Sequence, residues 1–209
     1  MVTRLELIKE LASIVPPEVL VVTSIGNNSY FWAELTDREA TLFHSTLGMC
    51  TPAAFGLAMA LPQRKVLALD SDGNLILNLG VLGTIANENP ANLTVLVMDN
   101  GNYLGSHKKE PGMRTATGGK MKLQEVANGC GIVSSHVVQD VGTFSTTIKS
   151  ALKSAGPHFV CARVQALDGE RPPKTKHVLD PRENKYQFAK YIERTEGVQI
   201  LGGGLGNFG

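Results

Sequence analysis

The sequence predicts an α/β fold, a doubly wound parallel sheet with helices on both faces. Uninterrupted apolar runs, such as those at 19–23 and 66–69, alternate repeatedly with segments of helical periodicity. Apolar runs without polar interruption are typical of parallel strands that are buried on both faces. With 209 residues, 43% of them hydrophobic and 19% charged, the chain can form one substantial globular domain.

The expected elements follow from periodicity and from turn residues. A helix ends at the Pro16-Pro17 pair, and Gly26 permits a turn after the first strand, with Asn28 or Ser29 as the N-cap of a short helix. We expect strands at 19–23, 41–43, 66–69, 93–98, 132–138 and 158–164. We expect helices at 5–15, 30–35, 51–60, 74–86, 123–129, 143–154 and 183–194. Residues 1–167 then form the domain, and 168–209 form a C-terminal extension with one helix and a flexible, glycine-rich end.

Composition excludes several classes of function. The ordinary globular composition argues against disorder and against nucleic-acid binding through bulk charge, and the formal net charge of +1 says nothing about partners. No apolar run reaches the roughly 18 residues of a membrane span, and the N-terminus begins an amphipathic helix instead of a signal peptide. Three cysteines without metal-ligand spacing, Cys50, Cys130 and Cys161, indicate free thiols. We therefore expect a cytoplasmic protein.

Polar turns follow two strands that a single helical segment connects. The first turn contains Asp70 and Asp72, and the second contains Asn100 and Asn102. Because parallel strands joined by one crossover end at the same edge of a sheet, the two turns should lie close together. A carboxylate and amide oxygens beside a helix N-terminus suit a divalent cation that carries a diphosphate. The alternative is that Asp70 or Asp72 is a simple N-cap.

The motifs LFHSTLGMC, ALDSDGNLI and VMDNGNY occur in this order within 19–164. Together they resemble thiamine diphosphate-dependent enzymes, and most closely the sulfopyruvate and phosphonopyruvate decarboxylases. The resemblance implies the diphosphate-binding (PP) domain of such an enzyme, comparable to a separate beta subunit. It also implies thiamine diphosphate and Mg²⁺ as cofactors.

The resemblance assigns roles to individual residues. The Mg²⁺ ligands would be Asp72, Asn100 and the carbonyl oxygen of Asn102. Backbone N–H groups of Gly73 and Asn74 would contact the diphosphate, and Ser71 and Gly26 would belong to the same cofactor-binding site.

Two further residues would shape the cofactor itself. Leu47 would be the apolar wedge that bends the cofactor, and the carbonyl oxygen of Ser45 would accept a hydrogen bond from the aminopyrimidine. Without the resemblance, plain core packing is the alternative for Leu47. The chain departs from the family at Ser45 and Ser71, which replace glycines, and at Asp99, which replaces the first residue of an Asn-Asn pair.

A catalytic glutamate is the missing part. In the family this residue contacts the pyrimidine ring and comes from a second, homologous domain, for which this chain has no room. We therefore expect a pyrimidine-binding (alpha) partner subunit that supplies the glutamate, with the active site at the interface. A non-catalytic cofactor-binding module is the alternative.

Basic residues dominate the loop after the second turn: His107, Lys108, Lys109, Arg114, Lys120 and Lys122. They would suit a small anionic 2-oxo acid, although an exposed, solvated loop explains them equally well. His107 and His44 are candidate proton donors after decarboxylation, with a structural role as the alternative for each. The predicted reaction is decarboxylation of a 2-oxo acid to CO₂ and an aldehyde. Carboligation, in which a second carbonyl compound replaces the proton, is the alternative.

Overall fold

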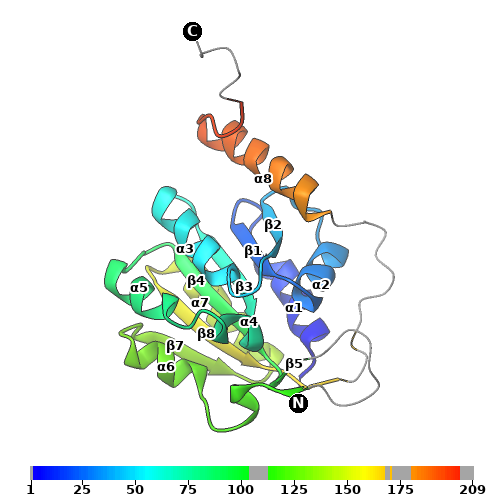
Figure 1. The fold of residues 1–209 in the computed structure, drawn as a ribbon, viewed down its shortest axis with the longest axis vertical. Helices are drawn as coiled ribbons and strands as arrows, with labels where there is room; N and C mark the ends of the chain where they lie inside the picture. Colours follow the sequence, from blue (N-terminus) through cyan, green and yellow to red (C-terminus); the bar gives the residue numbers. More distant parts are fainter. Residues whose placement is uncertain (1, 104–112, 168–169, 171–179, 203–209) are drawn as a thin grey trace.

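The structure is a computed structural model that describes residues 2–103, 113–167, 170 and 180–202. Its centre is a six-stranded, fully parallel sheet in the order β2-β1-β3-β4-β8-β7 (Figure 1). The strands of this sheet are β1 Leu20–Ser24, β2 Thr41–Ser45, β3 Val66–Ser71, β4 Leu93–Asp99, β7 Ser134–Val138 and β8 His158–Arg163. The predicted doubly wound α/β fold is confirmed.

Helices cover both faces of the sheet. The longer helices are α1 Arg4–Ile14, α2 Asn27–Leu35, α3 Cys50–Ala60, α5 Val81–Glu88, α7 Val141–Lys153 and α8 Pro181–Glu196. The shorter elements are α4 Asp72–Ile76, α6 Leu123–Gly129, the 3₁₀ helix η1 Ala116–Gly118, and a two-stranded antiparallel ribbon of β5 Asn102–Tyr103 and β6 Met113–Arg114.

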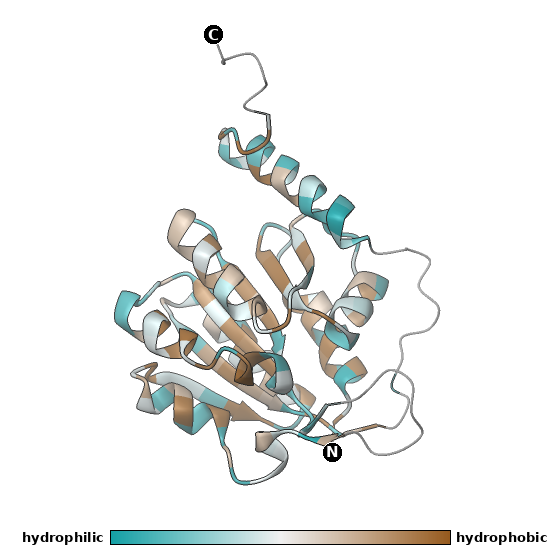
Figure 2. Cartoon of the chain, in the orientation of Figure 1, coloured by the Kyte–Doolittle hydropathy of each residue, from teal (hydrophilic) through white to brown (hydrophobic). Residues whose placement is uncertain are grey.

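The strands are buried on both faces because successive side chains enter two different cores. In β3, Val66 and Ala68 belong to the core under α3, α4, α5, α6 and α8, whereas Leu67 and Leu69 belong to the core under α1, α2 and α7. Figure 2 shows the sheet as the apolar centre of the molecule. This double burial explains why the apolar runs in the sequence are continuous and do not alternate with polar residues.

Strand order reverses at β1, which lies between β2 and β3. The chain runs from β1 outward to β2, then crosses back so that β3 and β4 extend the sheet on the other side. A reversal of this kind leaves a crevice beyond the carboxyl ends of the two central strands, where ligands of such sheets bind. Here β1 ends at Ser24, close before Gly26, and β3 ends at Ser71, directly before Asp72.

The prediction of one helix at 74–86 was wrong. The segment forms the five-residue α4 and then α5, with turns between them in which Asn78 N–H bonds to Leu75 and Val81 N–H bonds to Asn78. Asn78 and Gly80 are poor helix formers and permit this interruption. The macrodipole behind Asp72 is therefore that of a single short turn of helix, weaker than we expected.

The predicted cap of the second helix was also wrong. Helix α2 begins at Asn27, and its N-cap is Gly26, whose φ of 100° lies in the left-handed region that glycine tolerates. Asn28 and Ser29 lie inside the helix, where both are buried and bond to the carboxyl ends of β1 and β3. The strand expected at 132–138 begins two residues later, at Ser134.

Helix α8 covers the edge of the sheet. The side chain of Asn184 accepts a hydrogen bond from Phe43 N–H at 2.7 Å and donates one to the carbonyl oxygen of Thr41 at 2.9 Å. These are the backbone groups that a neighbouring strand would otherwise bond, so α8 protects β2 from pairing with another chain. Across the described part of the chain, no helix combines the length and the apolar character that a membrane crossing requires.

Candidate cofactor site

The loops after β3 and β4 are tied together by threonine hydroxyl groups. Asp72 Oδ2 accepts hydrogen bonds from Thr115 Oγ1 at 2.7 Å and Thr117 Oγ1 at 2.9 Å. Thr117 Oγ1 also lies 2.7 Å from Asp99 Oδ1. The chain therefore returns from the β5–β6 ribbon over the sheet edge and bridges Asp72 to Asp99, the residue before Asn100.

The site carries excess negative charge. Asp72 is 1% exposed and Asp99 is 4% exposed. Among the described residues, neither carboxylate forms an ion pair with a basic side chain. Burial raises the pKa of Asp72, and the nearby Asp99 raises it further, while the bond from Thr115 opposes both effects. Two buried carboxylates with only neutral donors favour a bound cation.

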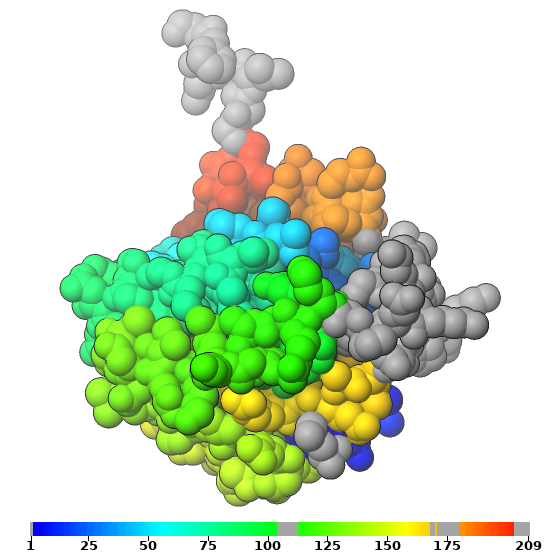
Figure 3. Space-filling view, turned by 60° about the horizontal axis from the view of Figure 1, so that its bottom comes forward, coloured from blue at the N-terminus to red at the C-terminus, as the bar shows by residue number. Residues whose placement is uncertain are grey.

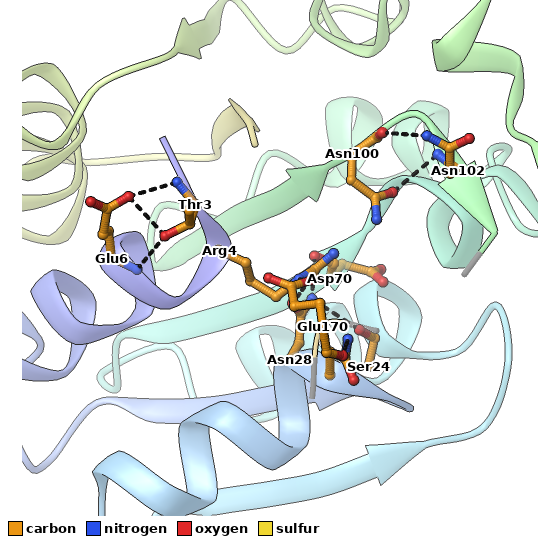
Figure 4. Close-up of polar contacts among 10 residues, drawn as sticks. Thr3, Arg4, Glu6, Ser24, Asn28, Asp70, Asn100, Asn102 and Glu170 are labelled. Atoms are coloured by element: carbon orange, nitrogen blue, oxygen red, sulfur yellow. Dashed lines mark hydrogen bonds and ion pairs between the residues drawn. The ribbon is translucent and has the colours of Figure 1, made fainter. Parts of the chain in front are cut away.

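Asn100 and Asn102 form a compact turn beside this pair (Figure 4). Asn100 Oδ1 accepts a hydrogen bond from Asn102 N–H at 3.1 Å, and Asn102 Nδ2 donates to the carbonyl oxygen of Asn100 at 3.0 Å. An amide oxygen has two acceptor sites, so Asn100 retains one for a metal ion.

The donor set fits a hard divalent cation. It consists of a carboxylate, an amide oxygen and backbone carbonyl oxygens, the ligand types that Mg²⁺ prefers. In the described ranges, no group of three or more His, Cys, Asp or Glu side chains could hold a metal ion. The oxygen donors of Asp72 and Asn100 are therefore a candidate site for Mg²⁺.

Asp70, which lies at the end of β3, is the centre of a second buried network. Its carboxylate accepts bonds from Thr51 Oγ1 at 2.6 Å, Ser71 N–H at 2.8 Å and Asn74 Nδ2 at 2.6 Å. Asn74 Oδ1 in turn accepts a bond from Gly48 N–H at 2.8 Å. The turn at 71–74 and the loop that carries Leu47 are thus fixed to one carboxylate.

Leu47 does not pack in the core of this chain. Its side chain is 61% exposed, and two other large apolar residues near it in this network, Met49 and Leu77, are also exposed. The core-packing alternative is therefore wrong for the described chain. An exposed apolar side chain on a loop that is held by buried hydrogen bonds can serve as a rigid wedge.

The other predicted residues lie around the same edge. Ser45 Oγ donates to the carbonyl oxygen of Thr23 at 2.9 Å, which joins the ends of β2 and β1. Gly73 approaches the ring of Tyr103 so closely that an added Cβ would lie 2.5 Å from Cε1. In Figure 3 the end of β4 and the segment after it (green) lie beside the end of β8 (yellow).

His44 lies near the carboxyl end of β2 and has an unusual conformation. It is a non-glycine residue with a φ of 50°, and its ring contacts Tyr30 edge-on at a centroid distance of 4.9 Å. Burial lowers the pKa of His44, and Nδ1 is buried without a partner among the described residues. Burial therefore disfavours the imidazolium form of His44. The prediction for His107 lies outside the described residues.

Sequence reasoning missed Thr115, Thr117 and the central role of Asp70. The threonines sit in a polar segment whose return over Asp72 no local pattern indicates. For Asp70 a signal was available, because a carboxylate at the end of a buried strand needs several donors to remain there.

A doubly wound parallel sheet with an oxygen-rich cluster at its switch point defines an α/β cofactor-binding domain. Residues 9–162 match the family described as "Thiamine pyrophosphate enzyme, C-terminal TPP binding domain". The chain belongs to this family.

Several relatives cover nearly the whole chain. It is 28% identical over 194 residues to sulfopyruvate decarboxylase subunit beta of Methanocaldococcus jannaschii, which covers 92% of this chain and 98% of the relative. It is 31% identical over 193 residues to phosphonopyruvate decarboxylase of Streptomyces viridochromogenes, covering 91% of this chain but 46% of that protein. The fold resembles benzoylformate decarboxylase from Polynucleobacter necessarius, with a TM-score of 0.68 at 18% identity over 81% of this chain and 34% of that one.

Proposed function

We propose that this chain is the diphosphate- and Mg²⁺-binding subunit of a heteromeric thiamine diphosphate-dependent 2-oxo acid decarboxylase. The observation that carries the proposal is the pair of buried carboxylates, Asp72 and Asp99, which Thr117 bridges without a basic partner in the described residues. The similarity to sulfopyruvate decarboxylase beta subunits supports the reaction class. When bound, thiamine diphosphate would supply the electron sink for loss of CO₂.

The chain's own residues would bind and orient the cofactor. Asp72, Asn100 and the carbonyl oxygen of Asn102 would hold Mg²⁺, and the N–H groups of Gly73 and Asn74 would contact the diphosphate. A short helix can still offer these first-turn N–H groups, because they have no partner within the helix.

The remaining site residues would act on the other end of the cofactor. Leu47 would bend it, the carbonyl oxygen of Ser45 would accept from its amino group, and Gly26 and Ser71 would line the crevice. His44 would donate a proton to the product from its imidazolium form and return to the neutral imidazole, and the product leaves as an aldehyde.

A partner subunit completes the site in this proposal. The chain spans 98% of a protein named a beta subunit but only 46% of the single-chain phosphonopyruvate decarboxylase. Half of the longer enzyme is thus outside this chain, and that half would correspond to an alpha subunit that supplies the glutamate. The exposed apolar side chains of Leu47, Met49 and Leu77 support the proposal that the alpha subunit covers this edge of the sheet.

The substrate would be a small anionic 2-oxo acid. Basic residues of the segment after Asn102 would attract its second acidic group; of these, Arg114 pairs with Asn102 in the β5–β6 ribbon. Three free cysteines support a reducing, cytoplasmic compartment as part of the same proposal.

Reconstitution tests the proposed reaction. The chain would be combined with a candidate alpha subunit, thiamine diphosphate and Mg²⁺, and then supplied with a series of 2-oxo acids. We expect CO₂ and an aldehyde from the pair and no turnover from the isolated chain. A hydroxyketone product would assign carboligation instead, and the absence of turnover with every partner and substrate would favour a non-catalytic binding module. Robust turnover by the isolated chain would contradict the need for a partner.

A further inference from the structure

A buried ion pair connects helix α1, near the N-terminus, to Glu170, which follows the last strand of the sheet. Arg4 in α1 and Glu170, which follows the domain, have side chains that are 5% and 4% exposed, and Arg4 Nε lies 2.9 Å from Glu170 Oε2. Glu170 is also held by its backbone, since its carbonyl oxygen accepts a bond from Asn27 Nδ2 at 2.6 Å. This pair lies outside every motif that the sequence singled out.

Arg4 also connects the ion pair to the carboxyl ends of the strands, through Asn28. One of its guanidinium nitrogens, Nη1, donates to Asn28 Oδ1, which orients the amide of Asn28 (Figure 4). Asn28 Nδ2 then donates to the carbonyl oxygen of Asp70 at 2.8 Å and to Ser24 Oγ at 3.2 Å. One amide therefore bonds to the carboxyl ends of both β1 and β3, the two strands that flank the switch point.

We propose that the Arg4–Glu170 pair positions the cofactor site by fixing Asn28 against the carbonyl oxygen of Asp70. The next residues along the chain are Ser71 to Asn74, which form the proposed diphosphate turn, so this inference rests on the proposed function. The side chain of Asp70 holds Asn74 and, through it, Gly48 in the wedge loop. A shift of Asp70 would therefore displace both segments that contact the cofactor.

The chemistry of the pair fits a positioning role better than a stabilising one. Removing two charges from water costs about as much as their attraction returns, so a buried ion pair contributes little net stability. The planar guanidinium of Arg4, in contrast, fixes the positions of both partners, because its Nε bonds to Glu170 and its Nη1 bonds to Asn28 in one rigid plane. Lysine, a point charge on a flexible stem, could not hold both partners in this way.

Three variants of the full chain test this inference: Arg4→Met, Glu170→Gln and the double variant. The readouts are the dissociation constant for thiamine diphosphate with Mg²⁺, from calorimetry on the chain combined with the alpha subunit, and the melting temperature of the chain. Arg4→Met should raise the dissociation constant about tenfold and lower the melting temperature, because it leaves Glu170 buried and unpaired. The double variant should recover melting temperature but not affinity, because the charges balance again while Asn28 still lacks its donor.

Glu196→Gln is the matched control. It removes another ion pair that ties the C-terminal segment to the rest of the chain, Arg64–Glu196, which is also largely buried but contacts none of the site residues. Its dissociation constant should stay within about twofold of wild type. If affinity recovers together with melting temperature in the double variant, or if Arg4→Met binds as wild type does, the positioning role is overturned. If the wild-type chain combined with the alpha subunit binds no thiamine diphosphate, the proposed function fails first, and this inference falls with it.

Discussion

Replacing Thr117 with valine tests how the two acidic loops are joined. Valine has nearly the same shape as threonine, so Thr117→Val removes the hydroxyl group and leaves the packing of η1 in place. The lost group lies 2.9 Å from Asp72 Oδ2, 2.7 Å from Asp99 Oδ1 and 2.8 Å from Thr115 Oγ1. The variant therefore leaves two buried carboxylates without their shared donor.

The expected loss of stability in Thr117→Val follows from the single proton that the threonine hydroxyl group can donate. A hydroxyl group donates one proton at a time, so one hydrogen bond to a charged group is lost, worth about 1.5–3 kcal/mol. Because Thr117 is only 4% exposed, water cannot simply replace the missing donor. The free energy of unfolding should fall by that amount in the absence of Mg²⁺ and cofactor. With both present the loss should be smaller, because a cation would compensate the carboxylates.

Urea denaturation with and without thiamine diphosphate and Mg²⁺ measures both values. Thr146→Val is the control, since its hydroxyl group bonds only to backbone carbonyl oxygens on the exposed side of α7 and should change stability by less than about 0.5 kcal/mol. If the unfolding free energy of Thr117→Val lies within about 0.5 kcal/mol of the wild-type value, the Thr117 hydroxyl group does not bridge Asp72 and Asp99. An equal loss in both conditions would refute the cation at this position.

Three further changes test other parts of the structure. Gly73→Ala should destabilise the protein by about 1–3 kcal/mol, because the new Cβ would overlap the ring of Tyr103, and adding Tyr103→Ala should reverse part of the loss in a thermal melt. Asn184→Ala should cost about 1–3 kcal/mol through two lost bonds to the edge of β2, whereas Asn87→Ala, whose amide bonds only to an exposed neighbour, should cost almost nothing. Burial lowers the pKa of His158 below 6.5, so the unfolded chain takes up a proton at higher pH than the folded one, and stability should fall as pH drops below 6.5. A pH series of denaturation curves should show a smaller fall for His158→Gln; identical slopes would contradict this origin.

The parallel sheet was predictable because its signal is local. Strands such as β3 and β4 are apolar throughout, and their order in the chain places Asp72 and Asn100 at one edge. The interruption between α4 and α5 was harder, since Asn78 and Gly80 weaken a helix without excluding it.

The groups that support the site could not be predicted in the same way. Thr117 reaches Asp72 across 45 positions of sequence, and Arg4 reaches Glu170 across 166. A lone threonine in a polar loop, or a lone arginine in an amphipathic helix, looks like an ordinary exposed residue. Only the closed fold reveals that Arg4 is buried, with its charge turned inward toward Asn28.

Binding of thiamine diphosphate tests the central claim most directly. With the alpha subunit present, calorimetry would compare the wild-type chain with Asp72→Asn, which keeps the shape of the side chain but removes its charge, and with Asp140→Asn, a control at the exposed N-cap of α7. We expect Mg²⁺-dependent binding by wild type and Asp140→Asn, and affinity weaker by at least about tenfold for Asp72→Asn. Equal affinity of all three proteins, or binding that is indifferent to Mg²⁺, would contradict a cofactor site at Asp72.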